Sequence, residues 1–390
     1  MKLSIIGLGQ AGCNITDAFY NVNDYASSIF GRRIQILNDA FAVNTDEADL
    51  AGLKHIPKDK AHRILIGDMT SFGHGVGKIN TYAAELLRSS NQAVVDTILR
   101  SSKFYESDAI MVIASGGGGT GSGMIGWTVK SIKERVSLPV YAIVALPFAF
   151  EMKGDTSFAV MNTATSINTV RKYADSIFLV DNERFRASKD NLTKTFTEMN
   201  KQIAESFYDL CCAGEERRGK YIGTKVMDAG DIMQSLEGFT NIGKGQVNLP
   251  VFRFFKEGYQ EAGNAQSSII GALGLAEANS SLGIKLEDAR RILVLVSAPR
   301  EAISVNVMES ISNFLQSKSP SSVIRIGDYP RRANEVVVSL IASGLTQVPG
   351  LEALLLHAEE LFKKKEEIRI ATAAQLEKLH AFSANIPTLD

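Results

Sequence analysis

The chain is poor in cysteine and tryptophan, and it has no long uninterrupted apolar segment. Its 390 residues include one tryptophan and three cysteines, namely Cys13 and the adjacent pair Cys211 and Cys212. Adjacent cysteines rarely bridge, and the three do not form the Cys-x-x-Cys spacing of a metal site. We therefore expect no disulfide framework, no metal held by cysteine, and a reducing, cytoplasmic compartment.

Apolar residues make up 45% of the chain, but they never run far enough to span a membrane. The longest nearly apolar stretch, Leu138–Phe150, contains two prolines and is about half as long as a membrane-spanning helix. The apolar opening, Leu3–Leu8, is too short for the core of a signal peptide. We expect no direct membrane insertion, and attachment through a membrane adaptor protein stays open.

The chain also lacks an excess of charge of either sign. Its 42 lysines and arginines balance 43 aspartates and glutamates, which leaves a net charge of −1. Binding to nucleic acid or to an anionic membrane through bulk charge requires a clear positive excess. We therefore expect no nucleic-acid partner.

Short apolar runs alternate with helical patterns through the first half of the chain. Near-continuous apolar runs are typical of parallel strands that are covered on both faces. The predicted strands are Leu3–Ile6, Ile34–Asn38, Arg63–Gly67, Ala109–Ser115, Val140–Leu146 and Ser176–Val180. The predicted helices include Gly12–Val22, Thr81–Ser101 and Met124–Arg135. This alternation predicts an α/β, Rossmann-like parallel-sheet domain over residues 1–188.

A long amphipathic helix is predicted next, at residues 189–213. Apolar residues recur along it at spacings of three or four, which indicates one buried face: Leu192, Phe196, Met199, Ile203, Phe207 and Leu210. Later strands are predicted at Arg290–Pro299, Ser322–Tyr329 and Asn334–Gly344, with a helix at Val305–Gln316. We predict a second, α+β domain at residues 214–346 and a charged helical tail at residues 347–390.

The first predicted strand leads directly into Gly7-x-Gly9-x-x-Gly12, the spacing of a dinucleotide-binding loop. Dinucleotide binding also requires an acidic residue about twenty positions further on, at the end of the second strand. Asp39 is the candidate for that position. An NAD(P)-dependent oxidoreductase is therefore one interpretation of the loop, and a plain tight turn between strand and helix is another.

A second loop is much richer in glycine. Ser115–Gly123, SGGGGTGSG, places six glycines between a predicted strand and a predicted helix. Such a loop presents a row of backbone N–H groups at a helix N-terminus, which suits phosphate, and Thr120 and Ser122 add hydroxyl donors. A third glycine-rich segment lies at Met69–Lys78. Because a dinucleotide needs only one such loop, three of them favour a nucleoside triphosphate with Mg²⁺.

The second loop resembles the signature of the tubulin/FtsZ superfamily, GTPases that polymerise into filaments. Other segments resemble the same family over most of the chain: GLGQAGCN at Gly7–Asn14, NTD within Val43–Leu50, LPFAFE at Leu146–Glu151, VDNE at Val180–Glu183 and FTEMN at Phe196–Asn200. The mixture of FtsZ-like and tubulin-like segments is most similar to the archaeal CetZ branch.

The resemblance implies a GTP/GDP site built from these segments. The implied binding residues are Gln10, Ala11, Gly12, Cys13 and Asn14 in the first loop, Gly117, Gly118, Gly119, Thr120, Gly121, Ser122 and Gly123 in the second, and Glu151, Asn182, Phe196 and Asn200 around the ribose and base. An asparagine amide both donates and accepts, so it suits the edge of a base; the preference for guanine comes from the resemblance alone. Asp155 and Lys201 depart from the FtsZ pattern.

The resemblance also assigns catalysis to Asp228 and Asp231, which match two acids that complete the site of the neighbouring FtsZ subunit. Val226 stands where FtsZ has asparagine. The alternative is that Asp231 only caps the helix that follows it. A site shared between stacked subunits implies head-to-tail filaments, and the family implies a role in cell shape. A filament for division or plasmid segregation, and a nucleotide-binding regulator that does not hydrolyse, stay as alternatives.

Overall fold

The structure is a computed structural model that describes residues 1–67, 73–154, 157–185, 191–249 and 259–383. In this part of the chain, ten strands form one continuous sheet in the order β3-β2-β1-β4-β5-β6-β7-β10-β8-β9. The strands are β1 (Leu3–Leu8), β2 (Leu37–Asn44), β3 (Arg63–Leu65), β4 (Ala109–Ser115), β5 (Val140–Leu146), β6 (Ser176–Asp181), β7 (Gly238–Asn248), β8 (Arg291–Ala298), β9 (Val323–Pro330) and β10 (Glu335–Leu345). Neighbours from β3 to β7 are parallel, as are β8 and β9, whereas β10 is antiparallel to β7 and β8. This arrangement confirms the predicted α/β class.

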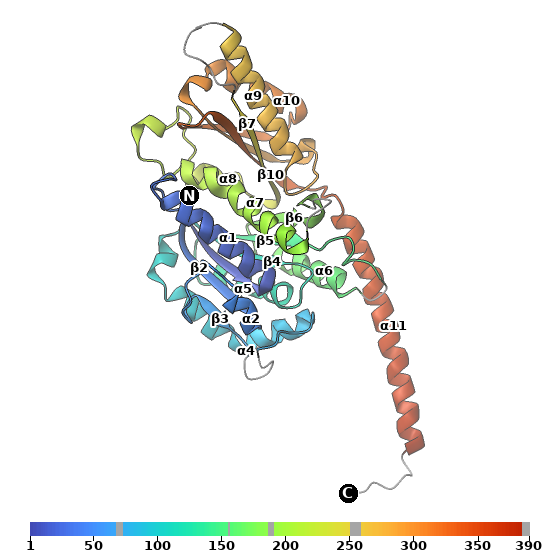
Figure 1. Ribbon diagram of the computed structural model, residues 1–390. Helices are drawn as coiled ribbons and strands as arrows, with labels where there is room; N and C mark the ends of the chain where they lie inside the picture. The colour runs from blue at the N-terminus through green and yellow to red at the C-terminus, as the bar shows by residue number, and fades with distance from the viewer. Residues whose placement is uncertain (68–72, 155–156, 186–190, 250–258, 384–390) are drawn as a thin grey trace.

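The helices cover both faces of the sheet in the N-terminal half, and in the C-terminal half two helices pack on one of its faces (Figure 1). They are α1 (Gly9–Ser27), α2 (Glu47–Ala51), α4 (Asn80–Leu99), α5 (Thr120–Lys133), α6 (Phe158–Val170), α7 (Leu192–Ala213), α8 (Ala229–Gln234), α9 (Tyr259–Ala278), α10 (Val305–Lys318) and α11 (Leu351–Ser383). The N-terminal half lies below the C-terminal half in Figure 1, and α7 crosses between them.

Successive residues of the parallel strands pack against opposite helical layers, as the two-residue period of a strand requires. Ile5 of β1 belongs to a buried cluster with Phe19 of α1 and Phe207 of α7. Its neighbour Ile6 belongs to the cluster that contains Leu87 of α4 and residues of α5. The sheet is therefore buried on both faces, which explains why its strands read as unbroken apolar runs.

Helix α7 buries the later part of its predicted stripe, whereas the prediction is wrong for Phe196, which is exposed. Met199, Ile203, Phe207 and Leu210 are each no more than 3% exposed. Its 22 residues correspond to about 33 Å at 1.5 Å per residue. The helix therefore extends from the carboxyl edge of the parallel strands to the start of the C-terminal half.

The prediction of a strand at Ile34–Asn38 is wrong. Strand β2 begins at Leu37 and ends at Asn44, because its polar residues are paired inside the fold. Asn38 donates to Ser107 and Asp39 accepts from Ser101. Asp39 is thus buried within the strand rather than placed at its carboxyl end.

Two elements of the C-terminal half have no counterpart among the predicted ones, namely β7 and α9. Strand β7 reads GFTNIGKGQVN, which has neither an apolar run nor clear alternation. Two of its glycines touch α9: a Cβ on Gly245 would lie 1.9 Å from the carbonyl oxygen of Ala272. The strand therefore depends on close packing of α9 and on pairing with β10, and neither is visible in its own sequence.

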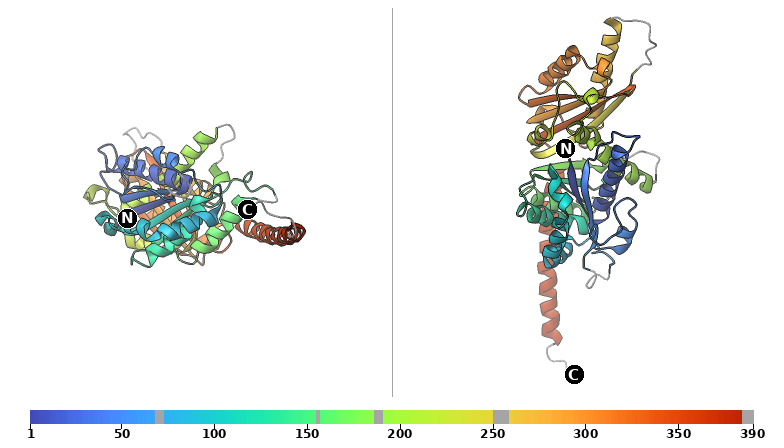
Figure 2. Two further views of the ribbon diagram at one scale, coloured as in Figure 1. Left: turned by 90° about the horizontal axis from the view of Figure 1, so that it is seen from below. Right: turned by 90° about the vertical axis from the view of Figure 1, so that its left-hand side faces the viewer.

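Helix α11 leaves the body of the molecule (Figures 1 and 2). Its first third packs on the body, with Leu354, Ala358 and Leu361 buried against α6. Among the described helices, including this one of 33 residues, none combines the length and apolar composition that a membrane span requires.

Candidate nucleotide site

The N-termini of α1 and α5 meet at the carboxyl edge of the parallel strands. A Cβ on Gly9, whose φ is +66°, would lie 2.7 Å from the backbone nitrogen of Gly121, and a Cβ on Gly121 would lie 2.6 Å from the carbonyl oxygen of Leu8. Only glycines allow this approach. Two helix N-termini side by side concentrate unpaired N–H groups and positive dipole ends, which is the arrangement that binds phosphate.

The glycine loop before α5 is fixed at its ends and open in its middle. A Cβ on Gly117 would touch Pro147 at 3.0 Å, and one on Gly119 would lie 2.8 Å from the Cα of Lys78. Gly118 between them has no heavy atom of the described residues within 4 Å of such a Cβ. The Gly118 carbonyl accepts from the Asn162 side chain at 3.0 Å. This hydrogen bond fixes the backbone of the loop while the side of Gly118 where a Cβ would stand remains open.

The two hydroxyls of this loop differ in what they offer to a phosphate. Ser122 donates back to the carbonyls of Gly118 and Gly119, so its proton is used inside the loop. Thr120 lies 2.8 Å from the Thr45 hydroxyl, and a pair of hydroxyls leaves one proton for a further acceptor. Thr120 therefore fits the predicted role of donor better than Ser122 does.

The third glycine-rich segment lies beside the second loop. Gly73, Gly75, Gly77 and Lys78 all have positive φ, and that of Lys78 is 65°. A lysine in this conformation is uncommon, and here its backbone contacts the Gly119 position. From the sequence, Lys78 receives no role of its own beyond ending this glycine-rich segment. Met69 and the other residues at 68–72 lie outside the described part.

The first-loop residues are divided between the surface and the core. Gln10 is exposed and donates to Asp49 at 2.7 Å, and Asn14 is exposed at the start of α1. Ala11 is partly exposed, whereas Gly12 packs on the carbonyl of Ile113. Among these residues, only the exposed side of the turn is accessible to a ligand.

Cys13 does not present its thiol to the surface. It is 1% exposed in a cluster with Leu50 and Leu53, and burial raises the pKa of the thiol far above its ordinary value. Cys13 can therefore contribute to a ligand only through its backbone.

A second group of residues lies where β5, β6 and α7 meet. Phe196 of α7 is 39% exposed and meets the Phe148 ring edge-on, with centroids 5.6 Å apart. Asn200 follows one helical turn later on α7. Glu151 accepts from the Phe148 backbone N–H at 2.9 Å, so its carboxylate closes the turn after β5. Asp155, in the same region, lies outside the described residues.

Asn182 supplies the clearest sign that this group receives a ligand. The side chain is 5% exposed, and its Oδ1 has no hydrogen-bond partner among the described residues. A buried amide oxygen without a partner costs about 1–3 kcal/mol. A base or ribose that donates to this oxygen would remove that cost.

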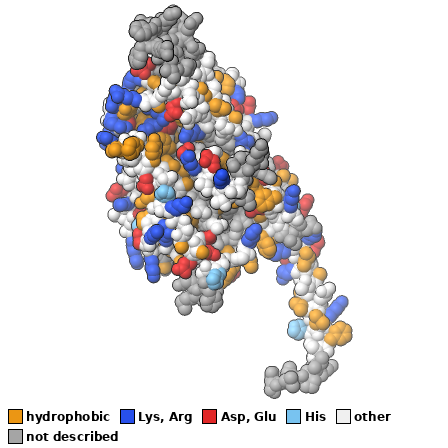
Figure 3. All heavy atoms as spheres, viewed as in Figure 1, with side chains coloured by type: hydrophobic (Ala, Val, Ile, Leu, Met, Phe, Trp, Pro, Cys, Tyr) orange, Lys and Arg blue, Asp and Glu red, His pale blue; other side chains and the backbone are white. Residues whose placement is uncertain are grey.

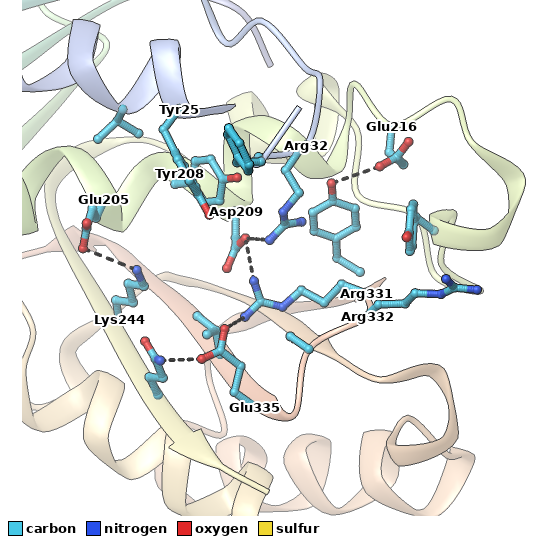
Figure 4. Close-up of a pocket in the computed structure, with 18 of the residues that line it drawn as sticks. Tyr25, Arg32, Glu205, Tyr208, Asp209, Glu216, Lys244, Arg331, Arg332 and Glu335 are labelled. Atoms are coloured by element: carbon cyan, nitrogen blue, oxygen red, sulfur yellow. Dashed lines mark hydrogen bonds and ion pairs between the residues drawn. The ribbon is translucent and has the colours of Figure 1, made fainter. Parts of the chain in front are cut away.

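Lys201, the departure next to Asn200, turns away from this group. Its ammonium lies 3.8 Å from Glu205, one turn along α7. Both residues line a cavity of about 600 Å³ at the junction between the two halves of the molecule. Figure 4 shows this junction, where Arg32, Asp209 and Arg331 form a chain of ion pairs.

The structure separates the two predicted catalytic acids from the glycine loops. Asp228 and Asp231 form a capping box at the start of α8, where Asp228 is the N-cap and accepts from the Asp231 N–H at 2.8 Å. The alternative that Asp231 is the cap is therefore wrong in detail, since Asp228 fills that position. Asp231 is 41% exposed and lies 3.8 Å from Arg325, so its carboxylate remains accessible.

Helix α7 sets the distance between the acids and the base-side residues. Gly214 ends α7, and a Cβ there would lie 3.3 Å from the Cα of Asp228. Phe196 stands near the other end, about 27 Å away at 1.5 Å per residue. The two groups of candidate residues therefore occupy opposite ends of one element.

Comparison with known families agrees with this geometry. The Tubulin/FtsZ family GTPase domain matches residues 2–190, and the C-terminal domain of tubulin-like CetZ proteins matches residues 189–360. The chain is 30% identical over 394 residues to the tubulin-like protein CetZ1 of Haloferax volcanii, covering 95% of this chain and 94% of that protein.

Solved structures give the same result. The GDP-bound monomer of Haloferax volcanii CetZ1 superposes with a TM-score of 0.78 at 29% identity, covering 92% of this chain and 99% of that one. The GTPγS-bound protofilament of CetZ2 from the same organism gives 0.79 at 25% identity, covering 94% and 100%. The chain therefore belongs to the tubulin/FtsZ family of GTPases, in its CetZ branch.

Proposed function

We propose that the chain binds GTP across its glycine loops and hydrolyses it within head-to-tail filaments that control cell shape. The observation that carries the proposal is the separation along α7, with Phe196 near one end and Asp228 against the other. One copy does not bring both ends to the same nucleotide, whereas two stacked copies do. The GTPγS-bound CetZ2 protofilament supports such stacking for a relative.

In this proposal, the phosphates bind at the joined N-termini of α1 and α5. The open backbone at Gly118 and the spare hydroxyl proton of the Thr120–Thr45 pair face them. The base lies against Phe196 and donates to the partnerless Oδ1 of Asn182, with Asn200 at its edge. Glu151 receives the ribose.

Hydrolysis is assigned to the acids of the neighbouring copy. The carboxylates of Asp228 and Asp231 would orient the attacking water. Magnesium would neutralise phosphate charge and would be bound chiefly by phosphate oxygens, since the described residues contain no cluster of three or more His, Cys, Asp or Glu side chains placed to hold a metal.

The proposed setting is the cytoplasm, with the chain itself as the main partner. We propose no nucleic-acid partner, and any membrane contact would go through an adaptor protein. A filament for division or plasmid segregation is the alternative use of the same chemistry. Deletion of the gene distinguishes control of cell shape from these alternatives. A changed cell shape with normal division supports the proposal, and failed division or plasmid loss contradicts it.

The biochemical test measures GTP turnover per molecule against protein concentration, with light scattering in parallel. A shared site predicts a specific rate that climbs with concentration as assembly begins. Asp228→Ser keeps an N-capping oxygen and removes the carboxylate, so it should spare folding and GTP binding while lowering turnover. A flat specific rate would show that each copy carries its own catalytic group.

A mixing experiment sharpens this test. Asp231→Asn keeps its own nucleotide site, and Asn182→Leu keeps its own acids. Neither variant alone should turn over GTP at the wild-type rate. If the site is shared, mixed filaments place the intact acids of one variant on the intact nucleotide of the other, and part of the activity returns. No recovery on mixing, despite co-assembly, would contradict the shared site.

A further inference from the structure

The apolar side chains of the outer two-thirds of α11 belong to none of the buried clusters formed by the described residues. Its inner part packs on α6 through Leu354, Ala358 and Leu361. From residue 362 to residue 383 every position is exposed. The matched CetZ C-terminal domain ends at residue 360, so this projecting segment lies outside it. Figures 1 and 2 show the segment extending past the N-terminal half and away from the C-terminal half.

Two apolar residues of the projecting segment lie on the line of α11 that packs on α6, forming a stripe with polar residues between them. Ile368 and Leu379 follow the buried Leu361 by 7 and 18 residues, which returns to within about 20° of the same line at 3.6 residues per turn. Their exposed fractions are 54% and 63%, and Leu376 beside them is 51% exposed. Figure 3 shows hydrophobic side chains along this helix. A surface helix normally turns such a stripe toward another protein surface.

A helix of this length is also marginal by itself in water. An isolated helix needs tertiary packing on its amphipathic face for most of its stability. The 22 exposed residues, 362 to 383, have none of that packing from the described part of this chain. A surface that covered the stripe in the assembled state would supply this packing.

The position of α11 indicates which surface that is. The helix starts on α6, whose Asn162 binds the Gly118 carbonyl of the glycine loop. It therefore leaves from the nucleotide end of the molecule, while Asp228 lies at the other end of α7. In a head-to-tail stack, the next copy occupies the space beyond the nucleotide end. The projecting stripe then runs along the flank of that copy.

The spacing of the stripe disfavours a coiled coil between two α11 helices. A coiled coil requires a strict seven-residue apolar repeat. Here Lys365 and Thr372 stand where the repeat needs apolar residues, and the step from Thr372 to Leu376 shifts the line. A straight helix on a broad protein surface tolerates both features.

We propose that residues 362–383 of α11 form a strap that docks its Ile368, Leu376 and Leu379 stripe on the next copy of the chain in the filament. The inference rests on the proposed head-to-tail filament. It adds a second longitudinal contact, outside the nucleotide interface, that holds neighbouring copies together.

The first test introduces a single accessible cysteine. The chain's own three cysteines are free but buried, so they should not react with the label. In Leu379→Cys, the new cysteine is the accessible thiol of the described residues, and it is labelled with a maleimide photo-cross-linker. GTP-dependent filaments should give covalent chains of two or more copies on irradiation, with cross-links from α11 to the body of a neighbour. Ile370→Cys, which lies on the opposite side of the helix and is 58% exposed in the parent chain, should cross-link far less.

The second test measures the critical concentration for GTP-dependent pelleting. Combined Ile368→Gln, Leu376→Gln and Leu379→Gln should raise it at least tenfold while GTP binding by the unassembled chain is unchanged. Ile370→Gln should leave it unchanged. A truncation after Ser383 controls for the residues beyond the described helix and should also assemble normally.

The outcomes separate the strap from the filament itself. Filaments that form without cross-links from position 379, and that tolerate the triple variant, overturn the strap and leave the proposed function intact. Cross-links between two α11 helices without GTP indicate a helix pair and overturn the strap. Binding of the unassembled chain to anionic phospholipid vesicles, lost in the triple variant, assigns the stripe to lipid and overturns it too. Absence of filaments from the wild-type chain removes the proposed function and the strap with it.

Discussion

At the scale of residues, two buried asparagines differ in how many hydrogen bonds the fold gives their side chains, and this difference indicates their roles. Asn162 donates to the carbonyls of Lys78 and Gly118, at 2.9 and 3.0 Å. Asn182 is equally buried, yet its Oδ1 has no partner among the described residues. The fold therefore satisfies the Asn162 amide, whereas the Asn182 oxygen stays available to the ligand that we propose.

Replacing Asn182 should therefore affect binding more than folding. Asn182→Leu removes the partnerless oxygen at similar volume, so the melting temperature without nucleotide should stay the same or rise. GTP affinity should fall about tenfold or more, which corresponds to roughly 1.4 kcal/mol. Asn162→Leu is the matched control and should lower both quantities. Thermal melting and a GTP titration measure the pair, and unchanged affinity in Asn182→Leu would remove this residue from the site.

Asp209 joins three segments at the junction in Figure 4. Its carboxylate lies 2.5 Å from the Arg32 guanidinium and 3.7 Å from that of Arg331, and the residue is 3% exposed. Burial by itself opposes ionisation, but Arg32, Arg331 and Lys244 together keep the pKa of Asp209 below its ordinary value. The ionised acid thus stabilises the contact between the two halves.

Asp209→Asn should lower the free energy of unfolding by about 3 kcal/mol near neutral pH, since it leaves the largely buried Arg32 guanidinium without a counter-charge, whereas Arg331 keeps its ion pair with Glu335 at 3.0 Å. Because the pKa is lowered by folding, the stabilisation is present above the unfolded value of about 3.9 and is lost as the pH falls through the folded value. Urea unfolding from pH 7 to pH 3 should show the gap between wild type and variant closing below about pH 4. A gap that stays constant with pH would contradict this assignment.

The sequence alone predicted which residues form the site, but it did not predict whether their side chains are exposed, buried or hydrogen-bonded. Asn182 and Cys13 were both predicted to bind, and only the fold shows that the Asn182 amide is buried without a partner while the Cys13 thiol packs in the core. Lys78 received no role, since its contact with Gly119 joins positions 41 residues apart. Such long-range contacts leave no local signal. The assignment of the site residues stays a prediction.

At the scale of elements, the contact of α1 with α5 requires glycine at positions 9 and 121. Gly121 cannot accept a methyl group without moving the carbonyl of Leu8, which would lie 2.6 Å away. Gly118, three residues earlier, has open space and an ordinary φ. The same substitution should therefore act differently at the two positions.

Gly121→Ala should separate the two helix N-termini and lower both GTP affinity and stability, by roughly 1–3 kcal/mol of unfolding free energy, the usual cost of overpacking. Gly118→Ala should fold as well as wild type, so any loss there is a loss of ligand contact. Urea unfolding and nucleotide titration of both variants distinguish the effects. Equal stability of the two variants would show that α1 and α5 move apart freely.

The bounds of a strand could be predicted where all of its residues are buried and apolar. The prediction failed where hydrogen-bond pairing or helix contacts determine the strand. Strands β4 and β5 begin and end where their apolar runs do. Strand β2 is displaced by three residues at its start, because Ile34 and Ile36 are buried before the strand begins. Strand β7 is invisible in the sequence because its glycines serve contact with α9. Helix α7 was predicted by its stripe, with position 189 outside the described residues.

At the scale of the whole molecule, the projecting part of α11 increases the maximum dimension of the unassembled chain. Truncation after Lys364 removes 19 described helical residues relative to truncation after Ser383, equivalent to about 28 Å at 1.5 Å per residue. Small-angle scattering of the two unassembled chains should show a decrease of this order in the maximum dimension. A change of a few ångströms instead would mean that the helix folds back on its own copy.

In the proposed filament, the separation of Asp228 from the nucleotide end would link hydrolysis to the position of a copy. A copy at one tip would present its nucleotide to solvent without a neighbour's acids, so that nucleotide would stay intact and exchangeable. Every interior copy would be covered by a neighbour and would begin to hydrolyse its nucleotide from the moment of covering. The distance of a copy from the tip would then increase with the time since it was covered, and the length of the unhydrolysed zone would increase with the growth rate of the filament.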